Sequence, residues 1–334
     1  MAEKLVGQNY ITPDLIAKVT GKSKYAEDFR AEGMLFAKLL LSPHPHARVT
    51  RIDSSAAMAL PGVKAILTFD DLPAAADAVN DNGQLILANI DGEVALTKEP
   101  VYQGQPILAV AAVDETTAAE AIERIEIEYE ALPFVVDPLV SLRPDGANAR
   151  TKGNYWFIPP PAAPGAPPPQ SPPRPEIREM KWTPAELTEA DAGRLPMMEG
   201  APEAWAYGDL EAGFKEAALV LDETFVTPDT SHQTLETRTA MAYWQNGKVH
   251  VYTGTQSTAQ TVLGVSRWVS VPPEDVVVVS EYTGGGFGSK ITGAISLVIP
   301  VLLAKKANAP VMMRITREEA VSYTHLTLPT ILRV

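Results

Sequence analysis

The sequence predicts a mixed α and β protein with two folded regions separated by a proline-rich stretch. Strand and helix signals alternate from Gly21 to Pro138, and ordered patterns return from Gly208. Between Pro159 and Pro175, ten of the seventeen residues are proline, which excludes helix and inner strand. This stretch is typical of an extended linker, and a ligand for proline-reading domains is the alternative. With 334 residues, 46% of them hydrophobic, the chain is long enough for two cores.

The first region is expected to contain strands and two short helices. Continuous or alternating apolar residues predict strands at 34–41, 63–68, 106–113 and 125–129. A helix at 55–60 is expected to take Ser54 as its N-cap and to stop at Pro61-Gly62. A second helix is expected at 115–124, capped by Asp114.

The second region repeats this mixture of elements. Asn246-Gly247 separates two apolar runs and predicts a β-hairpin, because both residues tolerate the left-handed backbone of its turn. Asp209 is the expected cap of the first helix of this region. The expected helices are 210–218, 255–269 and 292–306, and the expected strands are 219–226, 240–244, 248–252 and a β-branched run that starts at Val276 and ends in Thr283.

Charge and cysteine content exclude several classes of function. The formal net charge is −13, and an acidic surface repels nucleic-acid phosphates and anionic membranes. No apolar run reaches the ~18 residues that cross a bilayer, and residues 1–7 carry no apolar signal core. Without cysteine the chain forms no disulfide and holds no thiolate-bound iron–sulfur cluster. We therefore expect a cytoplasmic protein whose redox electrons, if any, leave to another polypeptide.

The strongest candidate site is a glycine-rich segment, Thr-Gly-Gly-Gly-Phe-Gly-Ser-Lys at 283–290, which follows the last predicted strand. Glycines let the backbone approach a ligand and let successive N–H groups converge on an anion. A phosphate loop is excluded because Ser289 precedes Lys290 and Ile291 follows it. The dinucleotide fingerprint fails as well, because its sixth place is Ser289 or Ile291 rather than glycine. A glycine-rich turn without a ligand remains the alternative.

Three sequence blocks in order resemble one known family. Gly284 to Lys290 resembles the first molybdopterin-contacting loop of the molybdenum hydroxylases, the large subunits of xanthine dehydrogenase, aldehyde oxidase and carbon monoxide dehydrogenase. His232-Gln-Thr-Leu-Glu236 resembles the family's His-x-x-Leu-Glu segment, and Gly254-Thr-Gln256 resembles its Thr-Gln segment. The first region resembles the family's α/β hammerhead domain, with matching sequence segments at 21–28, 42–48, 102–106 and 128–133.

The resemblance implies an α+β fold in which an α/β hammerhead domain precedes the first part of a molybdopterin-binding domain. The expected division is a leader at 1–15, the hammerhead at 16–138, a proline-rich linker or crossing segment at 139–205, and the truncated binding domain at 206–320. Residues 321–334 depart from the family and are expected to be a non-native tail. Because the family's catalytic glutamate lies in the part beyond this chain, the fragment itself is expected to be inactive.

The resemblance also implies roles for individual residues. Gln256 would lie beside the apical oxygen ligand of molybdenum, as a hydrogen-bond donor without charge. The cofactor would contact Gly285, Gly286, Phe287, Gly288 and Ser289. Purine-hydroxylating members carry a glutamate where this chain has Ile291, which argues against xanthine as substrate. An aldehyde, an N-heterocycle or another aromatic compound stays open.

The implied cofactor is molybdenum–molybdopterin or its cytosine dinucleotide form, whose dithiolene sulfurs hold the metal, so no metal-ligating side chain is expected. Water would supply the oxygen, and electrons would leave through iron–sulfur clusters and FAD on partner subunits. Two alternatives are a non-catalytic subunit-docking module and a dinucleotide-binding oxidoreductase. His232 and Glu236 lie four residues apart and suggest either a weak metal site or structural hydrogen bonds. Lys290 is expected to steady the loop, to face the cofactor's phosphate or to be solvated.

Overall fold

The computed structural model describes residues 7–73, 78–79, 85–86, 94–148, 154–158, 176–179, 181–193, 207–221, 232–291, 293 and 295–324. The chain divides into two compact units, which we treat separately. Unit 1 contains residues 1–132, 167–172 and 231–326, and unit 2 contains 133–166, 173–230 and 327–334. The proline run at 159–175 and residues 325–334 of the expected tail lie outside the described residues.

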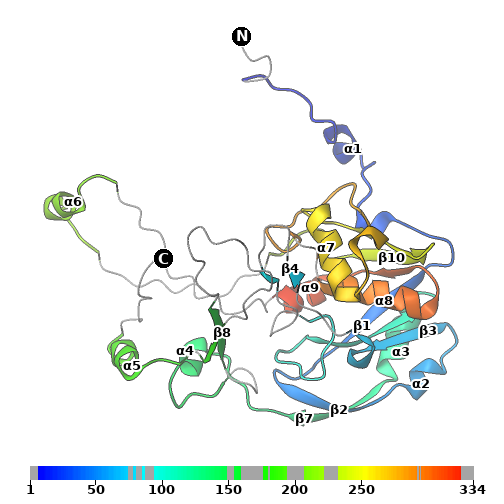
Figure 1. Cartoon of the computed structure of the whole chain (residues 1–334), viewed down its shortest axis with the longest axis horizontal. Coiled ribbons are helices and arrows are strands. Elements are labelled where there is room, and N and C mark those ends of the chain that lie inside the picture. The colour runs from blue at the N-terminus through cyan, green and yellow to red at the C-terminus, as the bar shows by residue number, and fades with distance from the viewer. Residues whose placement is uncertain are drawn as a thin grey trace. The chain divides into compact units, whose positions relative to one another are not determined.

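Within the described residues, unit 1 is built on a seven-stranded mixed sheet of order β12-β11-β10-β13-β1-β6-β3 (Figure 1). The pairs β1–β13 and β11–β12 are parallel and the others are antiparallel. The strands are β1 (Leu35–Leu41), β3 (Val63–Thr68), β6 (Pro106–Ala112), β10 (Ala240–Gln245), β11 (Lys248–Thr253), β12 (Val276–Val279) and β13 (Val311–Met313). Strands from both sides of the proline-rich stretch therefore share one sheet, and the predicted α+β class is confirmed.

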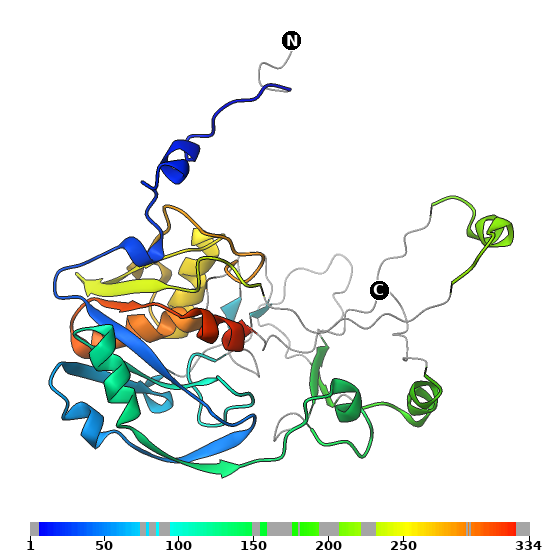
Figure 2. The same ribbon diagram turned by 180° about the vertical axis from the view of Figure 1, so that it is seen from behind.

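Helices cover both faces of this sheet. Helices α7 (Thr258–Val269) and α8 (Val298–Ala307) belong to the core on one face, which receives Ala109 and Ala111 of β6. Helices α2 (Ser55–Met58) and α3 (Glu115–Glu123) form the core on the other face, seen in Figure 2, with Leu108, Val110 and Ala112. Successive strand residues point to opposite faces. Because both faces are covered, β6 is apolar throughout instead of alternating.

The remaining elements of unit 1 are short. Strands β2 (Ala47–Asp53) and β7 (Glu126–Ala131) form a separate antiparallel ribbon. Strands β4 (Ala78–Val79) and β5 (Leu85–Ile86) pair with each other. The other elements are α1 (Leu15–Val19), η1 (Ala26–Asp28), η2 (Phe69–Asp71), η3 (Pro273–Asp275), η4 (Ile295–Leu297) and α9 (Arg317–Thr324). No helix among the described residues is long and apolar enough to cross a bilayer.

Two predicted helix starts in the first half have different outcomes. Asp114 caps α3 as predicted, because its carboxylate accepts a hydrogen bond from the backbone N–H of Thr117 at 2.7 Å. The prediction that the Ser54 side chain caps α2 is wrong, since it makes no capping hydrogen bond. The Asp53 carboxylate instead accepts from the Ser55 backbone N–H (3.1 Å) and hydroxyl (2.6 Å). A carboxylate one residue earlier replaces the predicted hydroxyl cap.

The predicted hairpin is confirmed, with β10 and β11 joined at Asn246 (φ 53°) and Gly247 (φ 79°). Helix α7 begins at Thr258, three residues later than predicted, because the Ser257 hydroxyl accepts from the Gln260 N–H and caps it.

The predicted start of the next helix at residue 292 is wrong. Gly293 has a φ of 74°, which a right-handed helix cannot contain, so regular helix α8 starts only at Val298, after η4. The glycine-rich segment therefore does not run directly into a helix N-terminus. Any anion site at this loop must use the loop's own backbone and its neighbours.

In unit 2 the structure describes α4 (Pro138–Ser141), the paired strands β8 (Tyr155–Ile158) and β9 (Glu176–Glu179), α5 (Pro184–Asp191) and α6 (Leu210–Glu216). Asp209 caps α6 as predicted by accepting from the Ala212 N–H at 3.0 Å. Residues 219–221 form no strand, contrary to the prediction, and the other predicted strand residues, 222–226, lie outside the described residues.

Candidate functional site

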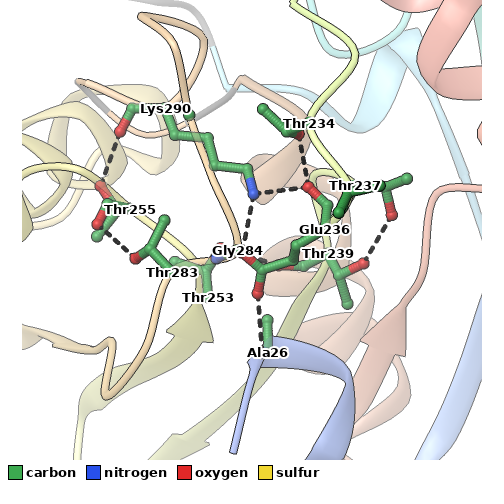
Figure 3. Close-up of polar contacts among 12 residues, drawn as sticks. Ala26, Thr234, Glu236, Thr237, Thr239, Thr253, Thr255, Thr283, Gly284 and Lys290 are labelled. Carbon is green, nitrogen blue, oxygen red and sulfur yellow. Dashed lines mark hydrogen bonds and ion pairs between the residues drawn. The ribbon is translucent and has the colours of Figure 1, made fainter. Parts of the chain in front are cut away.

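Three loops meet at one edge of the main sheet, and they contain the three sequence blocks singled out above (Figure 3). Residues 232–239 lead into β10, residues 254–257 follow β11, and residues 280–291 follow β12. Because β11 and β12 are parallel, both end at this edge, and because β10 is antiparallel to β11, it starts there. The carboxyl ends of parallel strands are where open α/β sheets bind ligands. The topology thus brings Lys290 against Glu236, which lies 54 residues earlier in the chain.

Gln256 is bound to the glycine-rich segment along both its backbone and its side chain. Its backbone N–H donates to the Lys290 carbonyl at 2.9 Å. Its side-chain oxygen Oε1 accepts from the backbone N–H groups of Gly288 (3.1 Å) and Lys290 (3.3 Å). Two donors facing one atom fix the orientation of the amide. The Nε2 amino group must then point away from these two N–H groups, and no described residue accepts a hydrogen bond from it.

Gly286 is glycine because Gln256 fills the space that a side chain would need. A Cβ atom at Gly286 would lie 2.2 Å from Oε1 and 2.4 Å from Cδ of Gln256. Such distances do not occur between non-bonded atoms. An alanine here would displace the amide and break its two bonds to the loop.

The loop backbone is held in an uncommon conformation. Gly285 and Gly288 have φ values of 97° and 102°, and Phe287 has a φ of 51°. A positive φ is costly for an aromatic residue, and such strain concentrates at functional sites. The Phe287 side chain is also 74% exposed although it is large and apolar. Both observations suggest that the loop is shaped for a neighbour other than the residues that the structure describes.

Below the loop, Glu236 and Lys290 form a buried ion pair. Lys290 Nζ lies 2.9 Å from Glu236 Oε2 and donates to the Glu236 carbonyl at 2.8 Å. The Glu236 side chain is 8% exposed and the Lys290 side chain is 2% exposed. Burial lowers the pKa of Lys290, and the carboxylate of Glu236 offsets part of that shift. Of the alternatives considered for Lys290, the solvated lysine is therefore wrong, and the side chain steadies the loop.

The Glu236 carboxylate also binds two backbone N–H groups. Oε2 accepts from Gly284 at 2.8 Å, and Oε1 accepts from Ala26 at 3.2 Å (Figure 3). A Cβ at Gly284 would lie 2.5 Å from the Cβ of Glu236, and one at Gly254 would lie 2.2 Å from Oε2. Both glycines therefore make room for this carboxylate. Both carboxylate oxygens accept structural hydrogen bonds. For Glu236 this agrees with the structural interpretation from the sequence rather than with the metal site.

His232 lies in the same loop but does not join that network. Its Nδ1 atom is buried and has no hydrogen-bond partner among the described residues. It lines a cavity of about 20 Å³ together with Thr234, Ser289 and Arg317, room for about one water molecule. No group of three residues that could bind a metal ion occurs in the part of the chain that the structure describes.

The other predicted site residues lie on the same loop. The Ser289 hydroxyl donates to the Gly286 carbonyl at 2.8 Å, so it closes the turn rather than facing outward. Ile291 follows the loop and is 45% exposed. Sequence reasoning missed Ala26 and Arg317. The Arg317 guanidinium donates to the carbonyls of Thr234 (2.5 Å) and Leu235 (3.0 Å) and holds that loop in place. Arg317 falls within residues 206–320, which the resemblance assigned to the binding domain, but Ala26 contributes only a backbone N–H, which no sequence pattern reveals.

Comparison with known proteins agrees with this architecture. Residues 20–133 match the family "Aldehyde oxidase and xanthine dehydrogenase, a/b hammerhead domain", and residues 196–334 match "Molybdopterin cofactor-binding domain". The chain is 29% identical over 312 residues to a probable xanthine dehydrogenase subunit of Bacillus subtilis, covering 93% of this chain and 35% of that protein. It is 27% identical over 319 residues to "Nicotinate dehydrogenase large molybdopterin subunit" of Eubacterium barkeri, covering 95% of this chain and 63% of that protein.

Among solved structures, quinoline 2-oxidoreductase from Pseudomonas putida 86 shares the fold, with a TM-score of 0.67 and 23% identity over 94% of this chain and 35% of that one. The two family matches define the class. The chain belongs to the molybdenum hydroxylase family of xanthine dehydrogenases and aldehyde oxidases. Its hammerhead domain precedes part of the molybdopterin-binding domain, as predicted. The chain spans about a third of the length of the first relative and under two thirds of the second.

Proposed function

We propose that this chain is the N-terminal part of the molybdopterin-binding subunit of a molybdenum hydroxylase. In this proposal Gln256 and the backbone of residues 285–288 form one wall of the cofactor site. The proposal depends on one observation. At one edge of the sheet, the side-chain oxygen of Gln256 accepts hydrogen bonds from two N–H groups of the glycine-rich loop. The rest of the site would come from sequence beyond this chain.

The residues present fit such a cofactor. The loop has no side chain at Gly285 or Gly288, so a flat ligand can approach its backbone closely at these two residues. The Gln256 amide is held by its oxygen and directs its amino group away from the loop amides, which suits a hydrogen bond to an oxygen-rich ligand. The exposed Phe287, Leu235 and Ile291 side chains are 74%, 93% and 45% accessible, and such apolar surface normally requires a covering partner.

When bound, molybdenum–molybdopterin supplies the oxidation of a carbon–hydrogen bond with water as the source of oxygen. The protein supplies positioning and electrostatics. Gln256 would orient the cofactor through Nε2 without adding charge. The loop backbone would set its distance from the sheet. The general base is proposed to lie in the C-terminal part of the subunit, so the 334-residue chain alone is proposed to be inactive.

Ile291 is proposed to face the substrate. An isoleucine side chain forms no hydrogen bond, so it offers nothing to the polar edge of a purine and suits an aldehyde or an N-heterocyclic or aromatic substrate. Ile291 is half-exposed at the end of the loop, where a substrate could reach it. This placement supports the substrate class and leaves the particular compound open.

The proposed partners are subunits carrying iron–sulfur clusters and FAD, in a cytoplasmic complex. The chain has no cysteine and so cannot hold such clusters itself. The cofactor is proposed to be molybdopterin or its cytosine dinucleotide form. Sequence beyond the chain would bind the dinucleotide part.

Metal and pterin analysis of the complete subunit, isolated with its partners, tests the proposal. We expect about one molybdenum per subunit and a pterin fluorophore after acid oxidation. The 334-residue chain is the matched comparison, and we expect it to show no dye-coupled oxidation of aldehydes or azaheterocycles. Bound NAD without molybdenum would favour a dinucleotide-binding oxidoreductase. Absence of every ligand from a complete, folded subunit would favour a docking module, and either result would contradict the proposal.

A further inference from the structure

We propose that Glu236 and Lys290 are a positioning pair that fixes the shape of the glycine-rich loop and links that loop to the hammerhead domain. The inference rests on the proposed function only where it assigns a cofactor to the loop. The geometry of the pair is defined by the contacts of Glu236 with Gly284, Lys290 and Ala26. Neither residue would touch the cofactor, so both would act through the loop backbone.

One carboxylate oxygen binds both ends of the loop. Glu236 Oε2 accepts from the Gly284 N–H (2.8 Å), where the loop starts, and lies 2.9 Å from Lys290 Nζ, where the loop ends. Glu236 also donates its own N–H to the Gly284 carbonyl at 3.3 Å. The residues between these ends are the ones proposed to face the cofactor. Their path is therefore set by a group beneath them.

The other carboxylate oxygen binds the hammerhead domain. Glu236 Oε1 accepts from the Ala26 N–H at 3.2 Å, and Ala26 begins η1 ahead of β1 in the hammerhead domain. Ala26 is itself buried, so its N–H needs a partner within the protein. The same carboxylate thus joins the hammerhead, the loop before β10 and the glycine-rich loop. A shift of Ala26 would be transmitted to Gly284 through one side chain.

Removing two charges from water costs about as much as their attraction returns, so a buried ion pair adds little net stability. Apolar residues of similar size in these two positions would stabilise the core equally well. Removing one partner, by contrast, leaves an uncompensated buried charge and is strongly destabilising. A pair of this kind selects one arrangement of the segments that it joins, which is the property a cofactor loop requires.

Amide hydrogen exchange of the 334-residue chain tests the pair without any cofactor. We compare Lys290→Met, Glu236→Gln and the double variant with the unsubstituted chain. In each single variant we expect exchange of the hydrogen-bonded amides of Gly284, Gly288, Ser289 and Lys290 to accelerate by roughly a hundredfold, the size expected for a lone buried charge, while β1 and β6 stay protected. The double variant should recover much of the protection, because it contains no uncompensated charge.

Lys306→Met is the matched control, because it removes a lysine from the exposed ion pair with Asp71 (2.7 Å). We expect no change in loop exchange from it. Unchanged loop exchange in both single variants would overturn the proposal. Equal loss of protection in β1 and β6 would overturn it too, because the pair would then be a general stability element.

A pH series adds a second readout. Burial already lowers the pKa of Lys290 from 10.5, and the charged groups that act on it are Glu236, Arg238 and Arg317. In Glu236→Gln the carboxylate that raises this pKa is gone, so the folded-state pKa falls further below the unfolded value. Between those two values the unfolded chain binds more protons, so stability rises with pH. The loop defect of Glu236→Gln should therefore shrink as the pH rises toward the unfolded-state pKa of 10.5, whereas a pH-independent defect would contradict a role for the charge.

The two proposals can fail separately. Loss of loop protection in the single variants, together with a complete subunit that contains no molybdenum or pterin, would keep the positioning pair and reject the cofactor. Unchanged loop protection with a loaded subunit would reject the pair and keep the cofactor.

Discussion

The substitution Gly286→Ala is expected to reduce the molybdenum content of the complete subunit by roughly tenfold or more. This loss is equivalent to at least about 1.4 kcal/mol of cofactor-binding free energy. The new Cβ would lie 2.2 Å from Oε1 of Gln256. The amide must then swing away and release the N–H groups of Gly288 and Lys290. Molybdenum and pterin per subunit, measured with a thermal unfolding curve, separate loss of cofactor from loss of fold.

Two comparisons sharpen this test. Gly213→Ala, in α6, adds a methyl group with no atom within 4 Å apart from its chain neighbours and the backbone of its own helix, and it should leave the molybdenum content unchanged. If alanine at 286 acts by displacing Gln256, then Gly286→Ala combined with Gln256→Ala should load no less cofactor than Gln256→Ala alone. Additive losses would show that the methyl group acts elsewhere, for instance on the cofactor directly.

Glutamate in place of Gln256 is expected to lower turnover by about 10²–10³-fold, the usual effect of losing one preorganised hydrogen-bond donor at a reacting centre. A carboxylate oxygen can still accept from Gly288 and Lys290, so the loop should keep its shape. The Nε2 donor is replaced by a charged acceptor, which would repel an oxygen of the cofactor. Steady-state rates normalised to bound molybdenum measure the effect.

The same substitution at Gln260, in the first turn of α7, is the control for charge alone. Gln260 is exposed, and Gln260→Glu should change turnover little. Wild-type turnover in Gln256→Glu would show that the amide only supports the loop. A collapse of both loading and fold would show that the carboxylate cannot replace the amide oxygen there.

The sequence predicted those parts of the fold that depend on local pattern. The hairpin at Asn246-Gly247 and the cap at Asp114 followed from residue types with strong backbone preferences. The start of α8 was missed because the apolar run from 292 onward looks helical, while the left-handed φ of Gly293 interrupts it. Local propensity cannot reveal which single glycine adopts such a conformation.

For the candidate site, resemblance located Gln256 and the glycine-rich loop, and the structure brought them into contact. The pairing of Glu236 with Lys290 was not predictable, because 54 residues separate them and each is ordinary in its own segment. The bond from Ala26 depends on a backbone N–H, which every residue except proline offers. Tertiary contacts of this kind form only once the sheet has folded, because its parallel strands β11 and β12 then end at the same edge.

A structure of the complete, molybdenum-loaded subunit tests the central claim most directly. Our account predicts that the cofactor lies against the loop, with Nε2 of Gln256 and a backbone group of residues 286–288 within about 2.7–3.2 Å of it. A cofactor bound elsewhere, or side chains of the missing part packed against Gly286 and Gln256 in its place, would contradict the account.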